Sequence, residues 1–168
     1  CEEVRYIATG EDVRHSLSKD VRVLFVSSAD SCRSMMAEGI AKAIGGDHFD
    51  FFSAGVDAAA PDQRAVDFLS RKGIDISDHK ATTVSEIEGL GRFKVLVAIG
   101  PEAAGALPRA GYRTIVQEWD VADPSRFEGD EEARTHEYSV VFDELLERIT
   151  TLIRNLHGTT TSLEKGDQ

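Results

Sequence analysis

Apolar residues along this chain fall into short continuous runs that alternate with helically spaced stripes. Residues 21–26 form a β-branched run, which is typical of a strand buried on both faces. From residue 35 to 44 the apolar positions recur at helical spacing, and Gly45-Gly46 ends that helix. The same reasoning predicts strands over 49–53, 93–99 and 112–116. It predicts helices between Pro61 and Gly73, over 84–90 and 101–107, and along the stripe from Val141 to Leu156.

Strands that alternate with helices imply right-handed crossovers and a parallel sheet covered on both sides. We therefore predict an α/β fold with three layers and a four-stranded parallel sheet. In such sheets ligands bind beyond the carboxyl ends of the strands, near the point where the strand order reverses. The loop after the first strand is expected to lie there.

The polarity of the two ends divides the chain into three parts. Residues 1–20 lack an apolar period and suggest a linker or the fringe of a neighbouring segment. Residues 21–156 form one predicted domain, and the polar stretch 157–168 is predicted to be a disordered tail. Because the chain begins with Cys1, we favour a domain cut from a longer polypeptide over a lipid-modified N-terminus, for which no signal sequence is present.

Charge and composition narrow the possible partners. The formal net charge of −11 argues against nucleic acid or an anionic membrane surface. No apolar run is long enough to span a membrane. Two widely separated cysteines make a poor disulfide framework, so a reducing, cytoplasmic setting is expected. The five histidines show no metal-ligand spacing, and we predict neither a metal nor a cofactor.

The loop from Ser27 to Ser34 has the features of an oxyanion site. A tight loop of small residues between a strand and a helix directs several backbone N–H groups at one point, where the helix end adds partial positive charge. Arg33 can supply a planar guanidinium for two oxyanion oxygens. The predicted oxyanion-binding residues are Ser27, Ser28, Ala29, Asp30, Ser31, Cys32, Arg33 and Ser34. Alternatively, this is an ordinary helix start with a capping serine and a solvated arginine.

Several motifs, in order, resemble the low-molecular-weight protein tyrosine phosphatases and the thioredoxin-coupled arsenate reductases. They are Val23–Val26 with Ser31–Gly39, then Ser53-Ala54-Gly55, Gly73–His79 and Trp119–Pro124. The resemblance extends from about Val21 to Leu156 and implies the flavodoxin-like phosphatase I fold. It also implies a phosphorylated or oxyanion ligand as the binding partner.

The family's reaction uses a cysteine thiolate six residues before an arginine, together with an aspartic acid in an Asp-Pro loop. By resemblance, Arg33 is the arginine and Asp123 the acid, which would be vestigial if the reaction is lost. Ser27 stands at the nucleophile position. A serine hydroxyl needs an adjacent general base, and the loop contains no histidine, so we expect Ser27 to be inert.

A second departure is Asp30, where the family usually has asparagine. One explanation is that Asp, like Asn, tolerates a left-handed backbone. The other is that its carboxylate repels a phosphate, at a cost on the order of 4 kcal/mol for charges 4 Å apart at an effective dielectric near 20. We favour the backbone explanation.

The further cysteines that the reductase branch uses are also absent from this sequence. The region 99–108, where the resemblance would place two relay cysteines, contains none. Cys32 lies beside Arg33 but is out of position for in-line attack, and we interpret it as a buried structural thiol rather than a redox site.

Three functions remain open from the sequence. The first is a pseudoenzyme that binds phosphate or arsenate but is catalytically impaired. The second is an active protein tyrosine phosphatase, hydrolysing phosphomonoesters, captured as a Cys-to-Ser variant. The third is a non-catalytic protein-interaction module that binds neither phosphate nor arsenate, with a protein or a fused domain before residue 20 as its partner. Because both Ser27 and Asp30 depart from the family pattern, we favour the first and third over the second.

Overall fold

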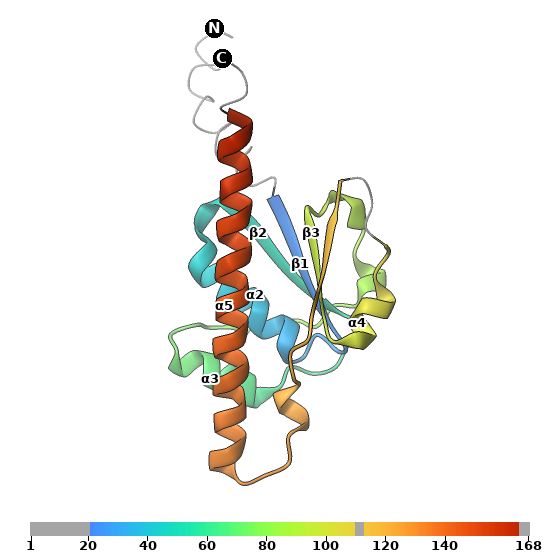
Figure 1. The fold of residues 1–168 in the computed structure, drawn as a ribbon. Coiled ribbons are helices and arrows are strands. Elements are labelled where there is room, and N and C mark those ends of the chain that lie inside the picture. The colour runs from blue at the N-terminus through green and yellow to red at the C-terminus, as the bar shows by residue number, and fades with distance from the viewer. Residues whose placement is uncertain (1–20, 110–112, 165–168) are drawn as a thin grey trace, which may run out of the picture.

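The structure is a computed structural model that describes residues 21–109 and 113–164. Its core is a sheet of four parallel strands, β1 (Val21–Ser27), β2 (Phe49–Gly55), β3 (Val95–Ile99) and β4 (Ile115–Trp119). The strand order is β2-β1-β3-β4, with helices on both sides (Figure 1). The predicted three-layer α/β fold with a four-stranded parallel sheet is confirmed.

One face of the sheet is covered by three helices and the other by shorter segments. The first face carries α2 (Arg33–Gly45), α3 (Gln63–Arg71) and α5 (Glu131–Glu164), whose apolar residues form one core cluster with the sheet. The second face carries α4 (Pro101–Ala106) and the 3₁₀ turns η2 (Val84–Glu86) and η3 (Leu90–Arg92). Two further turns, η1 (Gly46–His48) and η4 (Pro124–Arg126), connect elements.

Strand β1 shows why its sequence is apolar throughout. Val23 and Phe25 face the helix-rich cluster, whereas Leu24 and Val26 face the smaller one, and all four are fully buried. Successive side chains of a strand point to opposite faces, so a strand covered on both faces needs an unbroken apolar run. β1 lies between β2 and β3, so its end lies inside the sheet rather than at an edge.

The position of β1 also decides where a ligand site can form. β1 pairs with β2 on one side and β3 on the other. The connection after β1 therefore leads to one side of β1, and the connection after β2 leads back to its other side. The loop that follows Ser27 therefore opens at the carboxyl edge of the sheet, where the strand order reverses. The sequence-based placement of the loop agrees with this topology.

The fourth strand lies three residues later than the sequence predicts. The pattern indicated 112–116, whereas β4 spans Ile115–Trp119, and residue 112 itself lies outside the described residues. Pairing with β3 selects the later register and buries Trp119 beside Phe25, with ring centroids 5.9 Å apart. The apolar pattern of one segment does not show how that segment pairs with β3.

The single helix predicted over 84–90 is replaced by the two turns η2 and η3. Gly89 has φ of +71°, a left-handed conformation that interrupts a helix between them.

The predicted disordered tail from 157 to 168 is wrong over most of its length, because α5 continues to Glu164. Extending an existing helix costs little compared with starting one, so the polar residues after Leu156 are added to a formed helix. The ring of His157 also contacts that of Phe49, with centroids 5.0 Å apart, which holds the helix past the predicted end.

The predicted linker over 1–20 and residues 165–168 lie outside the described residues. Within 21–109 and 113–164, no helix is both long and apolar enough to cross a bilayer.

The buried stripe of α5 supplies a prediction about stability. Leu145 is fully buried in the helix-rich cluster, so Leu145→Ala should lower the free energy of unfolding by about 3 kcal/mol through lost burial and a cavity. Val140, 45% exposed on the same helix, is the control, and Val140→Ala should change it by less than about 0.5 kcal/mol. Urea unfolding of both variants measures the difference; equal losses would contradict the assigned packing of α5.

Candidate functional site

The loop after β1 is held in place by its backbone. The carbonyl groups of Ser27, Ser28 and Ala29 accept hydrogen bonds from the N–H groups of Val56, Asp57 and Ala59, at 2.9–3.1 Å. A Cβ on Gly55 would lie 2.5 Å from the backbone nitrogen of Asp30, so only glycine allows the two segments to approach so closely. The loop is thus built against the end of β2 before α2 begins at Arg33.

Arg33 lies across the mouth of the loop with its guanidinium fixed at both ends. Nη1 donates to the carbonyl of Val121 at 2.9 Å, and Nη2 donates to the hydroxyl of Ser28 at 3.3 Å. The side chain is nearly buried, and Gly100, with φ of +93°, leaves room where a Cβ would lie 2.8 Å from Nη1. The arginine is therefore a positioned group rather than a solvated surface residue.

The structure brings Asp123 to the same place. Its Oδ2 lies 3.7 Å from Nη2 of Arg33 and 3.5 Å from Nε of Arg126. Its Oδ1 accepts from the N–H and the hydroxyl of Ser125, at 3.0 and 2.6 Å, which fixes the carboxylate at the start of η4. An acidic residue 90 positions further along the chain than Arg33 thus lies beside the loop.

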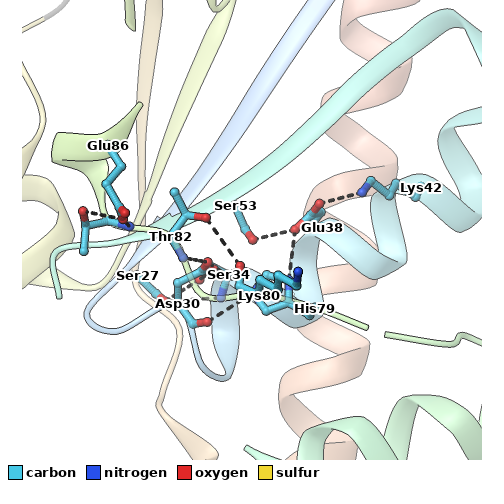
Figure 2. A network of polar contacts seen from close by, with 11 residues as sticks. Ser27, Asp30, Ser34, Glu38, Lys42, Ser53, His79, Lys80, Thr82 and Glu86 are labelled. Carbon is cyan, nitrogen blue, oxygen red and sulfur yellow. Dashed lines mark hydrogen bonds and ion pairs between the residues drawn. The ribbon is translucent and has the colours of Figure 1, made fainter. Parts of the chain in front are cut away.

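Asp30 has the left-handed backbone that we favoured as the explanation for an acidic residue in the loop. Its φ is +45°, and it is the one non-glycine residue with positive φ among those the structure describes. The carboxylate is fully buried. Its oxygens are bonded within the protein, Oδ1 to the hydroxyl of Ser34 at 2.8 Å and Oδ2 to the N–H of Thr82 at 3.0 Å and Nε2 of His79 at 3.1 Å (Figure 2).

Ser27 is linked to this carboxylate through Ser34. The two hydroxyl oxygens are 2.7 Å apart, and both residues are buried. An ionised carboxylate only accepts hydrogen bonds, so the single hydrogen of the Ser34 hydroxyl is directed to Asp30. The hydrogen between the two serines must then come from Ser27. The chain of donors therefore runs from Ser27 through Ser34 to Asp30.

His79 is held between two carboxylates. Nε2 faces Asp30, and Nδ1 lies 3.6 Å from Oε2 of Glu38 (Figure 2). Glu38 also accepts from the hydroxyl of Ser53 at 2.5 Å and from Lys42 at 2.6 Å. The hydrogen bond to Asp30 raises the pKa of His79 above its ordinary value, against the opposing effect of burial. Both ring nitrogens face acceptors, an arrangement that favours the imidazolium.

Cys32 is a buried thiol at the N-cap of α2. Burial, followed by the charges of Asp62 and Asp123, raises its pKa well above the ordinary value. Asp62 is itself bonded to the hydroxyl of Tyr138. The surroundings of Cys32 therefore favour the neutral thiol, in agreement with a structural role, and do not prepare it for attack.

The residues missed in the sequence are those that support Asp30 from outside the loop. His79 lies at the end of the motif Gly73–His79, which marked the position without indicating its partner, and Thr82 contributes only a backbone N–H. Because nearly every residue type carries a backbone N–H, the sequence gives no sign of this donor.

Among residues 21–109 and 113–164, no cluster of His, Cys, Asp and Glu could hold a metal ion.

The raised pKa of His79 gives a prediction about pH. A histidine whose pKa is higher folded than unfolded stabilises the fold fully below its ordinary value of 6.5 and loses this contribution as pH rises through the folded value. The free energy of unfolding of the parent should therefore fall over that interval. His79→Gln should be less stable at low pH and lack the fall, whereas His136→Gln, an exposed histidine on α5, should keep it. Denaturant titrations at several pH values measure this; identical profiles for the parent and His79→Gln would contradict the ion pair.

Known proteins with related sequences identify the family of this chain. The model of the low molecular weight phosphotyrosine protein phosphatase family matches residues 22–167. The arsenate reductase of Halalkalibacterium halodurans is 33% identical over 129 residues, covering 77% of this chain and 92% of the relative. The arsenate reductase of Bacillus subtilis is 32% identical over 127 residues, covering 76% and 91%.

Solved structures agree in fold. An arsenate reductase in the oxidized state has a TM-score of 0.69 at 25% identity, covering 80% of this chain and 97% of the other. A cysteine-to-serine mutant of the YwlE arginine phosphatase with a phosphorylated active site serine has a TM-score of 0.66 at 28% identity, covering 82% and 96%. The chain belongs to the low molecular weight phosphotyrosine protein phosphatase family.

Proposed function

We propose that the loop Ser27–Ser34 binds a phosphate-like oxyanion and that the domain has lost thiolate catalysis because Ser27 occupies the nucleophile position. The observation that carries the proposal is the fixed guanidinium of Arg33 at the N-terminus of α2, at the carboxyl edge of the sheet. A helix N-terminus and an arginine fork together favour a tetrahedral oxyanion. The ligand is phosphate, arsenate or a phosphorylated group.

The burial of Asp30 supports binding rather than opposing it. The repulsion considered from the sequence requires a carboxylate directed at the ligand. Both oxygens are instead bonded to Ser34, Thr82 and His79, and the imidazolium favoured at His79 offsets the charge. Arg33 and the N-terminus of α2 supply local positive charge at the loop, against the net negative charge of the whole chain.

The loss of thiolate catalysis rests on the surroundings of both candidate nucleophiles. Ser27 carries a hydroxyl, which the helix end does not ionise, and Cys32 is buried with a raised thiol pKa. Asp123 keeps a position beside Arg33 from which it could protonate a leaving group. The family's thiolate reaction would therefore lack its sulfur nucleophile and retain Arg33 and Asp123. The cytoplasmic setting and a protein partner stay predictions.

Oxyanion binding has a direct test by ligand-dependent stability. Phosphate or arsenate at about a hundred times its Kd should add about 2.7 kcal/mol to the free energy of unfolding. Arg33→Ala should abolish this increment, whatever its stability without ligand, whereas Arg71→Ala, an exposed arginine at the end of α3, should keep it. Thermal unfolding with and without ligand supplies the measurement. An increment of equal size in Arg33→Ala, or none in the parent, would remove the proposal.

Restoring the thiol should require two changes. In Ser27→Cys the thiolate would face Ser34, whose hydrogen is directed to Asp30, so no hydroxyl donor stabilises it. In Ser27→Cys with Asp30→Asn, the new amide can donate to Ser34 and free that hydrogen for the thiolate. A hydrogen bond to a charged group contributes about 1.5–3 kcal/mol, so the double variant should hydrolyse an aryl phosphate at least about tenfold faster than the single one.

The same assay contains its controls. Asp123→Asn in the double variant should lower the rate again if the acid position is retained. Ser27→Cys as active as the double variant would show that Asp30 does not compete for the hydrogen of Ser34.

A further inference from the structure

Ser27 and Asp30, the two loop residues that depart from the usual family pattern, lie at opposite ends of one hydrogen-bonded chain (Figure 2). We propose that Ser27 is a phosphoryl-accepting residue, whose hydroxyl attacks a phosphate ester bound in the loop while Ser34 and Asp30 carry its proton away. The inference rests on the proposed oxyanion binding and adds a covalent modification to it. It replaces the expectation from sequence that Ser27 lacks a base.

The direction of the donors leaves the oxygen of Ser27 ready to attack. Its hydrogen is directed to Ser34, 2.7 Å away, and is therefore not available to a bound anion. A lone pair of Oγ is the group that remains for the ligand. The N–H of Ser34, in the first turn of α2, approaches the same Oγ at 3.4 Å and can stabilise the negative charge that develops as the proton leaves.

Asp30 has one oxygen positioned to receive the proton. Ser34 donates to Oδ1, whereas His79 and Thr82 contact Oδ2. The contacts at Oδ2 fix the orientation of the carboxylate and leave Oδ1 as the end of the relay. An asparagine at position 30 would place an amide at the end of this chain, which cannot serve as a base. A hydroxyl nucleophile needs a general base to take its proton, and the Asp30 carboxylate is the base within reach of this chain.

The step balances in atoms and charge. A bond forms between Oγ of Ser27 and phosphorus, and the bond from phosphorus to the leaving oxygen breaks with its electron pair on that oxygen. The proton of Ser27 moves to Ser34, and the proton of Ser34 moves to Oδ1 of Asp30. An aryl oxide leaves unaided, whereas a poorer leaving group would take a proton from Asp123. Arg33, whose guanidinium is held at the loop by Val121 and Ser28, would contact the oxygens of the transferred group.

The roles in this step differ. Ser27 would touch the reacting phosphorus and is the catalytic residue. Ser34 and Asp30 act through Ser27 and are positioning and relay residues. A purely structural Asp30 would be needed equally for binding and for transfer, whereas a relay residue is needed for transfer alone. This difference separates the two roles experimentally.

The experiment incubates the protein with p-nitrophenyl phosphate and follows nitrophenolate release and the mass of the intact chain. We expect a burst of one equivalent and a phosphoryl group mapped to Ser27 by peptide fragmentation. Asp30→Asn should bind inorganic phosphate at least as tightly as the parent, because a negative charge is removed, and form phosphoserine about a hundredfold more slowly. Ser34→Ala should also slow transfer, and Ser27→Ala should abolish it. Asp67→Asn, a surface change of the same kind on α3, should match the parent.

Each other outcome is decisive. Phosphate binding without phosphoserine, or equal transfer rates in the parent and Asp30→Asn, would overturn the relay and leave oxyanion binding intact. Loss of both binding and transfer in Asp30→Asn would assign Asp30 a structural role only and overturn the relay. A phosphoryl group mapped to another residue would overturn the assignment of Ser27. Absence of phosphate binding in the parent would overturn the proposed function itself.

Discussion

The structure around the loop depends on a carboxylate that is fully removed from water. A buried charge is tolerated only when each oxygen is hydrogen bonded, because an unpaired one costs several kcal/mol in effective desolvation. Asp30 meets this condition with a hydroxyl from α2, a backbone N–H from Thr82 and the ring of His79. These three groups come from separate parts of the chain. The shape of the loop is therefore tied to the packing of the segment 79–82 against α2.

This constraint extends outward through His79. Its second nitrogen faces Glu38, which in turn holds Ser53 at the end of β2 and Lys42 one turn further along α2. The loop Ser27–Ser34 and the polar network behind it form one continuous set of contacts (Figure 2). Protonation of His79 therefore bears on both the stability of the fold and the charge beside the loop.

Ser27 and Asp30 have a common physical consequence through Ser34, which lies between them. A thiolate requires donors around it, whereas a hydroxyl requires an acceptor for its proton. Asp30 directs the hydrogen of Ser34 away from position 27, which suits a hydroxyl there and not a thiolate. Under the proposed phosphoryl transfer, the pair Ser27 and Asp30 is therefore chemically consistent.

The sequence by itself determined the parallel sheet and the position of the loop, because these depend on local patterns, and it singled out Arg33 and Asp123 as candidates through short motifs. Apolar continuity in β1 and helical spacing in α2 are properties of neighbouring residues. The register of β4 and the end of α5 were misplaced, since pairing with β3 and the contact between His157 and Phe49 join distant segments.

Only the tertiary structure decided what Asp30 does. From the sequence its carboxylate could repel a ligand or merely accommodate a left-handed backbone, and both explanations use the same residue. The backbone explanation is supported by φ of +45°, and the direction of the side chain is determined by His79 and Thr82, roughly fifty positions further along the chain. Hydrogen-bond direction depends on which groups meet in space, and for this loop those groups are brought together by folding alone.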